Sequence, residues 1–276
     1  MELRYTPAPE AIARMTTEEL RDQFLIRTLF EPDTFRMIYS DLDRAIAGSA
    51  VPVGQPLRLG PAPELRADFF CQRRELGVLN IGGAGTVSVD GQSFPLARLD
   101  GLYAGCGSRE ILFASDDPTD PARFFLLSFP AFANQPTTPI RKADATPVAL
   151  GTAEGANQRT IYKYIHPGGV KSCQLVMGFT QLAEGSVWNT MPPHTHQRRM
   201  EVYLYFGIPE GERVFHFMGQ PGETRHIVVA DSQAILSPSW SLHSGAGTRA
   251  YAFCWGMGGE NQDFGDIDPI ATKDLR

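Results

Sequence analysis

The chain has 276 residues, of which 42% are hydrophobic and 20% are charged, and its formal net charge is −6 at pH 7. This length can bury a substantial core, as one large domain or as two of ordinary size. Neither the basic nor the acidic residues form a long run. This argues against nucleic acid and anionic membranes as main partners, because both bind basic patches. No stretch of 18 apolar residues predicts a membrane span.

The four cysteines, Cys71, Cys106, Cys173 and Cys254, lie far apart and form no Cys-x-x-Cys motif. A secreted disulfide scaffold is not expected at this size and cysteine density. The first residues also lack the apolar segment of a secretion signal. We therefore expect a protein of the reducing cytoplasm.

The first element predicted along the chain is a helix over residues 17–25. Thr16 is a suitable N-cap, and Glu19 follows three residues later, which is the pattern of a capping box. After about residue 33 the pattern changes to short apolar or alternating runs, which are typical of strands in a sandwich or barrel. We expect such strands at residues 110–114, 123–128, 160–165, 172–179, 201–206, 213–218, 226–230, 233–236 and 250–255.

Two connections also have recognisable signals. Asp90-Gly91 lies between alternating residues and predicts a tight hairpin turn. The segment 131–158 is rich in Pro, Gly, Ala and Thr, so we interpret it as a linker.

The two sides of this segment resemble each other. Residues 72–82 match residues 197–207 when one gap is allowed, which places Glu75 at the position of Glu201. We therefore predict an all-β protein with two barrels in tandem and a few short helices. The first barrel would comprise residues 1–140 with the N-terminal helix, and the second residues 141–276.

The strongest chemical signal is a set of three histidines and one glutamate in the second half. His194 and His196 are two residues apart, so both rings project from the same face of a strand. Glu201 follows His196 after a short interval, and His243, which comes after Pro238, is expected to reach the site from a distant strand. Such a set suits Zn²⁺, Fe²⁺, Mn²⁺, Ni²⁺ or Co²⁺ rather than Ca²⁺. Two positions of a six-coordinate ion would stay open for substrate or water, so the site is predicted to be catalytic.

The first half lacks this set, since every histidine lies after residue 165. Arg109 falls near the position of His243. The positions of the other two histidines are taken by Asp68 and Phe70 or, with the gap, by Phe69 and Cys71. We therefore expect the metal site of the first barrel to be degenerate.

The pattern His-x-His-x4-Glu, followed by Gly207 and by Pro238-x4-His243, resembles the two motifs of the cupin superfamily, and the doubled copy resembles a bicupin. Two features depart from the usual motifs. Eight residues separate Gly185 from His194, where five are usual, and Trp240 stands where the second motif usually has glycine.

Longer strings narrow the resemblance. They occur at residues 73–83, 162–168, 172–178, 188–196, 223–230, 237–245 and 255–262. Together they resemble the 5-keto-4-deoxyuronate isomerase family, also called the 4-deoxy-L-threo-5-hexosulose-uronate ketol-isomerases, over nearly the whole chain.

The resemblance implies a cytoplasmic bicupin enzyme, commonly a homohexamer, with one Zn²⁺ per subunit. Such an enzyme converts 5-dehydro-4-deoxy-D-glucuronate to 3-deoxy-D-glycero-2,5-hexodiulosonate in pectin and uronate degradation. Its partner is the sugar acid, and neither nucleic acid nor membrane is implied. The family's zinc ligands fall on His194, His196, Glu201 and His243.

This isomerisation moves a proton from C2 to C1 through an enediol, so it needs a base. Tyr162, Lys163 and Glu223 are weak candidates, and a metal-bound water or a free oxygen of Glu201 are further options. The substrate carboxylate needs a cation, for which Arg198, Arg199 and Lys171 are candidates. Adjacent strand residues point to opposite faces, so only one of the two arginines is expected to face the site.

Three other functions stay open at this point. The cupin isomerase of inositol catabolism, which acts on 5-deoxy-glucuronate, performs the same exchange of carbonyl and hydroxyl. A cupin dioxygenase uses the same ligands for Fe²⁺ or Cu²⁺. A cupin that only binds a sugar or regulates another protein is the third alternative.

Overall fold

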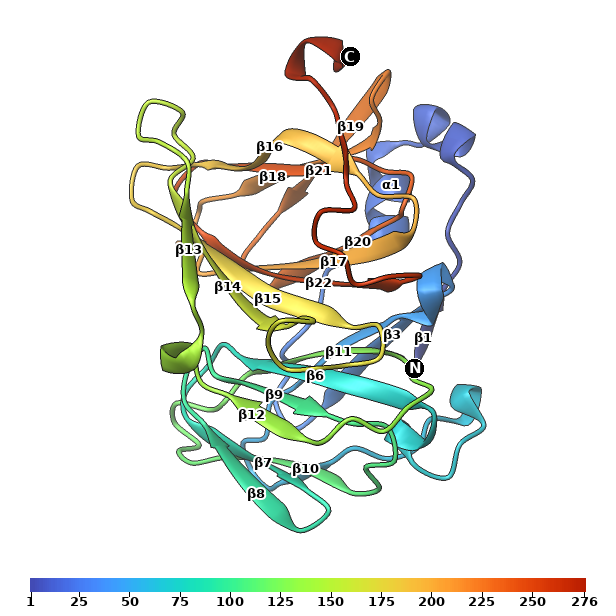
Figure 1. Ribbon diagram of the computed structural model, residues 1–276, viewed down its shortest axis with the longest axis vertical. Helices are drawn as coiled ribbons and strands as arrows, with labels where there is room; N and C mark the ends of the chain where they lie inside the picture. The colour runs from blue at the N-terminus through green and yellow to red at the C-terminus, as the bar shows by residue number, and fades with distance from the viewer. The chain divides into compact units, whose positions relative to one another are not determined.

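The computed structural model describes residues 1–276 and consists mainly of β-strands (Figure 1). It forms two compact units. The first comprises Met1–Arg4, Thr28–Thr146 and Lys163–Met177, and the second comprises Tyr5–Arg27, Pro147–Tyr162 and Gly178–Arg276. The all-β prediction is confirmed. The division at residues 140 and 141 stays a proposal.

The first unit contains two sheets. Its seven-stranded sheet has the order β1 (Glu2–Arg4), β3 (Phe35–Ser40), β4 (Ile46–Ala50), β11 (Phe124–Pro130), β6 (Arg74–Asn80), β9 (Gly101–Ala104) and β12 (Thr138–Ile140). Its four-stranded sheet has the order β5 (Leu57–Arg58), β10 (Ile111–Ser115), β7 (Gly85–Val89) and β8 (Gln92–Leu96).

Along the strands of the first unit, apolar side chains that point inward alternate with polar side chains that point outward, so the core is apolar. In β7, Val87 and Val89 are buried while Thr86 and Ser88 are partly exposed. Asp90 and Gly91 follow with φ of 51° and 83°, as a type I′ hairpin turn requires. The predicted turn is therefore confirmed.

The remaining strands form two further sheets. The seven-stranded sheet has the order β13 (Pro147–Leu150), β14 (Arg159–Ile165), β15 (Val176–Leu182), β22 (Ala252–Gly259), β17 (Arg199–Phe206), β20 (Gln233–Ser237) and β2 (Leu25–Ile26). The five-stranded sheet has the order β19 (Glu223–Val229), β18 (Val214–Gln220), β21 (His243–Gly247), β16 (Trp188–Thr195) and β23 (Asp268–Pro269).

The single α-helix, α1 (Thr17–Phe24), belongs to the second unit. The hydroxyl of Thr16 accepts a hydrogen bond from the backbone N–H of Glu19, whose carboxylate in turn accepts one from the backbone N–H of Thr16. The predicted capping box is confirmed, and the helix ends one residue earlier than expected. Short 3₁₀ helices occur at Pro9–Arg14, Leu42–Arg44, Pro63–Leu65, Phe70–Gln72, Lys142–Asp144 and Thr272–Asp274. None of the helices combines the length and hydrophobicity needed to cross a lipid bilayer.

The segment predicted as a linker contains two strands, β12 and β13. Both are outermost in their sheets, where proline is tolerated because an edge strand has backbone N–H positions that need no ladder partner. Pro139 and Pro147 belong to these strands. Interpreting the whole of 131–158 as a linker was therefore wrong, since its prolines do not exclude edge strands.

The strand expected at 172–179 begins only at Val176. The backbone N–H groups of Cys173, Gln174 and Leu175 instead donate to the carboxylate of Glu75. The carboxylate of Glu75 thus accepts the hydrogen bonds that a neighbouring strand would otherwise accept from these residues.

The internal repeat is visible in the sheet order. In one sheet β6 lies between β11 and β9, and in the other β17 lies between β22 and β20. The pairing of β6 with β9 begins at Leu76, and the equivalent pairing of β17 with β20 begins at Glu201. Leu76 is therefore the counterpart of Glu201, and the gap that placed Glu75 there was wrong. A shift of one residue turns a side chain to the opposite face of the strand.

Candidate metal centre

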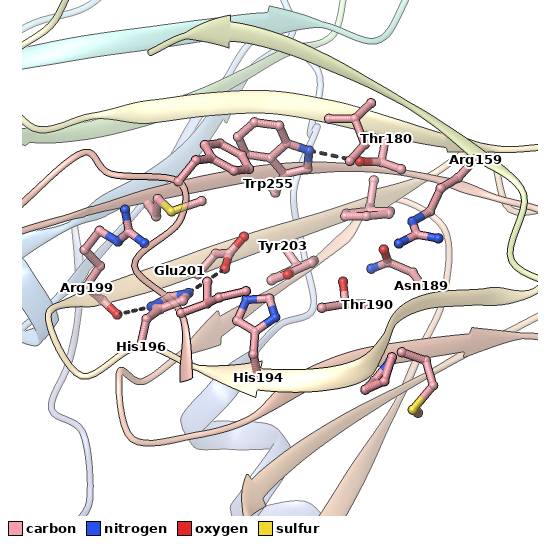
Figure 2. Close-up of a pocket in the computed structure, with 17 residues that line it drawn as sticks. Arg159, Thr180, Asn189, Thr190, His194, His196, Arg199, Glu201, Tyr203 and Trp255 are labelled. Atoms are coloured by element: carbon pink, nitrogen blue, oxygen red, sulfur yellow. Dashed lines mark hydrogen bonds and ion pairs between the residues drawn. The ribbon is translucent and has the colours of Figure 1, made fainter. Parts of the chain in front are cut away.

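Three elements of the second unit bring the predicted ligands together, and Figure 2 shows three of these residues, His194, His196 and Glu201. His194 lies on β16 and pairs in the ladder with His243 on β21. His196 follows directly after β16, and Glu201 lies on β17. The three imidazoles have ligand atoms within 4.8 Å of one another, which is compatible with a metal site.

The distances between donor atoms fit a shared ion. Nε2 of His194 lies 3.0 Å from Nε2 of His243. Oε2 of Glu201 lies 3.1 Å from Nε2 of His196 and 3.2 Å from Nε2 of His243. Ligand atoms that each lie about 2.0–2.1 Å from one cation are separated by roughly 2.8–3.4 Å in octahedral or tetrahedral geometry.

Hydrogen bonding and burial orient these groups. Nδ1 of His196 lies 2.8 Å from the backbone carbonyl of Arg199, so Nε2 of the same ring is directed toward Glu201. His196, Glu201 and His243 are between 1% and 3% exposed. Such burial is costly for a carboxylate without a cationic partner, so the donor set favours a bound cation.

The protonation of the histidines also suits metal binding. Burial lowers the pKa of His194, and burial together with the neighbouring imidazoles lowers the pKa of His243. Burial acts in the same direction on His196, but the hydrogen bond and charge of Glu201 outweigh it and raise its pKa. Two of the three imidazoles are thus held in the neutral form that binds metal.

The donor set opens into a pocket of about 300 Å³ that lies wholly within the second unit. Glu201 is the only carboxylate that lines it. The lining also includes Arg159, Ile161, Thr180, Asn189, Thr190, Met191, Pro192, Arg199, Tyr203, Phe253, Trp255, Met257, Phe264 and Ile267. A mainly apolar pocket with a few convergent polar groups is the usual form of a small-molecule site.

A model of the KduI/IolB family matches residues 28–270. The chain belongs to the KduI/IolB family. Two relatives carry the name 4-deoxy-L-threo-5-hexosulose-uronate ketol-isomerase. The protein from Lachnoclostridium phytofermentans is 55% identical and that from Caldicellulosiruptor bescii is 50% identical, each over 100% of both chains.

Solved structures of cupin-fold proteins share the architecture of this family member. An IolB-like protein from Salmonella typhimurium has a TM-score of 0.69 at 14% identity, covering 90% of this chain and 96% of its own. The oxalate decarboxylase–formate complex of Lactobacillus farciminis has a TM-score of 0.56 at 10% identity, covering 83% and 79%. At such identities the likeness concerns the fold alone, and it confirms the predicted cupin architecture.

The two arginines that were expected to compete for the pocket point in different directions, as the strand geometry predicts. Arg199 lines the pocket, and its guanidinium donates to the backbone carbonyls of Asp263 and Asp266. Arg198 does not line it. Its guanidinium pairs with the carboxylates of Asp266 and Asp268 and lowers the pKa of Asp266 to about 2.

The other candidates for base and substrate binding lie outside the pocket lining: Tyr162, Lys163, Lys171 and Glu223. The ring of Tyr162 stacks on Phe179 with centroids 4.6 Å apart. Lys171 and Glu223 are exposed. The structure thus brings the predicted metal ligands and Arg199 together, but none of these four.

Sequence reasoning missed five polar residues of the pocket, of which Tyr203, Asn189 and Arg159 are the most informative; the other two are Thr180 and Thr190. Tyr203 could have been found, because it lies two residues after Glu201 on the same face of a strand. Asn189 precedes His194 by an odd number of residues, and a register irregularity between them brings both to the pocket. Arg159 has no local signal, since it comes from a strand distant in sequence.

Proposed function

We propose that this protein is a metal-dependent ketol-isomerase that converts 5-dehydro-4-deoxy-D-glucuronate to 3-deoxy-D-glycero-2,5-hexodiulosonate. The observation that carries the proposal is the convergence of three imidazoles and a carboxylate at one end of a mainly apolar pocket. Full-length relatives at 50–55% identity that bear the corresponding name support it.

His194, His196, Glu201 and His243 would hold the ion, one per subunit. We assign Zn²⁺, because an N₃O set of three imidazoles and one carboxylate suits this borderline-soft ion, although other divalent transition metals fit the same donors. When bound, the ion would act as a Lewis acid that polarises the C1 carbonyl and C2 hydroxyl of the substrate.

Glu201 is also the best-placed group for proton transfer, because it is the only carboxylate lining the pocket. Its Oε2 faces two of the imidazoles, which leaves Oε1 to take the proton from C2 and return it to C1. In this isomerisation the C2–H and O2–H bonds break while a C1–H and an O1–H bond form, so the protons balance and no external oxidant or reductant is needed.

Tyr203 would support the same step as a hydrogen-bond donor. Its hydroxyl is within hydrogen-bonding reach of Thr190 and Glu201. Burial, followed by the charge of Glu201, raises the pKa of Tyr203 well above its usual value, so the hydroxyl keeps its proton. A neutral hydroxyl beside the carboxylate can stabilise the oxygen on which charge develops during enolisation.

The inositol-pathway isomerase, the dioxygenase and the non-catalytic cupin are less favoured, because the 50–55% identical relatives bear the uronate isomerase name. We further propose a cytoplasmic homohexamer that acts in pectin and uronate degradation, without nucleic acid or membrane partners. Phe132, whose side chain is 92% exposed, is a candidate for a contact between subunits. Light scattering of the purified protein tests the hexamer.

The deciding experiment follows the isomerisation of 5-dehydro-4-deoxy-D-glucuronate by NMR, before and after chelation and after addition of Zn²⁺. Turnover that is lost on chelation and restored by Zn²⁺ is the expected result. Absence of turnover by the metal-loaded protein would overturn the proposed reaction, and turnover that is indifferent to complete metal removal would overturn the role of the ion. In D₂O, Glu201→Gln is expected to lose exchange of the transferred hydrogen with solvent.

A further inference from the structure

The pocket contains one cation whose charge no acidic group balances. Arg159, the first residue of β14, is half-buried, and its guanidinium makes one hydrogen bond, of 2.9 Å, to the backbone carbonyl of Asn157. Burial lowers the pKa of Arg159, and the only charge that acts in the opposite direction is that of Tyr251. An arginine has five N–H donors, so most of its hydrogen-bonding capacity is unused by this contact.

Asn189 supplies a second unused donor in the same part of the pocket. Its side chain is 2% exposed, and Nδ2 has no hydrogen-bond partner in the protein. A buried amide without a partner costs stability, so its persistence at a pocket wall indicates a ligand that accepts the hydrogen bond. In Figure 2 the guanidinium of Arg159 and the amide of Asn189 point toward each other, at the opposite end of the pocket from Arg199 and His196.

The other cations near the pocket make more contacts than Arg159 does, although Nε of Arg199 is buried without a partner. The guanidinium of Arg199 donates to two backbone carbonyls and is subject to the charges of Glu201 and Asp266. That of Arg198 is bound by Asp266 and Asp268. Arg159 is therefore the pocket cation with the greatest capacity to bind an added anion.

We propose that Arg159 and Asn189 form a carboxylate-binding subsite that selects sugar acids over neutral sugars. This inference rests on the proposed function, because it takes the aldehyde end of the substrate to lie at Glu201. C1 and the carboxylate are the two ends of a six-carbon chain, so an acid group must lie away from the metal ligands. Arginine binds a carboxylate through two parallel hydrogen bonds, and the asparagine amide adds a third donor.

The test compares the uronate substrate with its neutral counterpart, in which C6 is an alcohol. Wild-type protein is expected to prefer the acid by roughly 10- to 100-fold in kcat/KM, the range of a charge-assisted hydrogen bond. Arg159→Met is expected to abolish this preference by raising KM for the acid, with the neutral compound unaffected. Arg159→Lys should restore part of the preference, because it keeps the charge but lacks the fork geometry. Asn189→Ala should weaken it by roughly 3- to 10-fold.

Arg249→Met is the matched control, since the side chain of Arg249 is 72% exposed and lies outside the pocket lining. Metal content and melting temperature equal to those of the wild type would show that the variants fold. A retained acid preference in Arg159→Met, or an equal loss for both compounds, would overturn the subsite.

Calorimetric titration with D-glucuronate keeps this test separate from the proposed reaction, because it needs no turnover. If the wild type binds D-glucuronate and Arg159→Met does not, the subsite stands even where the isomerisation assay fails. Equal binding by both proteins would refute the subsite, whatever the outcome of that assay.

Discussion

The two barrels share a strand order but differ in what fills them at equivalent positions. On β6, Leu76 and Val78 point into an apolar core that also contains Cys71 and Phe113. On β17, Glu201 and Tyr203 line the pocket. The same backbone frame therefore supports either a packed interior or a reactive pocket, depending on a few inward-facing side chains.

The two units also differ at the positions of the other ligands. In the first unit, the guanidinium of Arg109 lies over the ring of Phe69, 5.1 Å from its centroid. With Leu76 as the counterpart of Glu201, Phe69 and Cys71 stand at the positions of His194 and His196. The counterpart of His194 thus takes part in a cation–π contact, whereas His194 itself lies 3.0 Å from the imidazole of His243.

The two barrels also use buried glutamates for different purposes. The carboxylate of Glu75, fully buried, accepts hydrogen bonds from the hydroxyl of Tyr103 and from the backbone N–H groups of residues 173–175. That of Glu201 faces two imidazoles. A buried carboxylate surrounded by donors stabilises a loop, whereas one surrounded by imidazoles is suited to hold an ion.

The largest expected effect comes from giving the second barrel the residue of the first. Glu201→Leu should remove one metal ligand and the proposed base, so metal content should fall and kcat should decrease by roughly 1,000-fold or more. Elemental analysis and the NMR assay measure these changes. Glu184→Leu, at an exposed position, is the control. Undiminished activity in Glu201→Leu would contradict both roles of Glu201.

A change at Glu75 should affect stability and spare the metal. Glu75→Gln loses the charge-assisted hydrogen bonds and directs an amide N–H₂ toward donors, so the free energy of unfolding should fall by about 2–4 kcal/mol. Urea unfolding measures the loss, and exposed Glu154→Gln provides the comparison. If Glu75→Gln instead lost its metal with unchanged stability, the contrast between the two glutamates would be wrong.

The smallest effect concerns pH, and it arises from a buried histidine of the second barrel, His216. Burial lowers the pKa of His216 to about 3, and its Nδ1 lies 2.7 Å from the hydroxyl of Tyr205. The pKa in the folded state is thus below the unfolded value of about 6.5. The unfolded chain therefore binds more protons between these values, and stability is lost as the pH falls from 6.5 toward 3, by up to about 1.4 kcal/mol per pH unit.

His216→Gln should therefore show a shallower decline of unfolding free energy than the wild type between pH 6.5 and 4.5. The measurement is urea unfolding at several pH values, with exposed His226→Gln as the control. Identical slopes for the wild type and His216→Gln would show that His216 is not protonated on unfolding in this range.

Local patterns in the sequence were sufficient to predict several parts of this protein. The capping box at Thr16 and the turn at Asp90-Gly91 depend only on neighbouring residues. The same holds for part of the ligand pattern, since the two-residue spacing of His194 and His196 fits one face of a strand and Glu201 follows only five residues later. These features are predictable because the residues that determine them are close together in the chain.

Tertiary structure decided what depends on residues that are distant in the chain. The register of β6 determines that Leu76, rather than Glu75, is the counterpart of Glu201, and the carboxylate of Glu75 delays the start of β15. Arg159 reaches the pocket from a separate strand, and no local pattern distinguishes it from a surface arginine. The sequence by itself thus determined the type of fold and the residues proposed to hold the metal, whereas the pocket around them arises only when distant strands pack together.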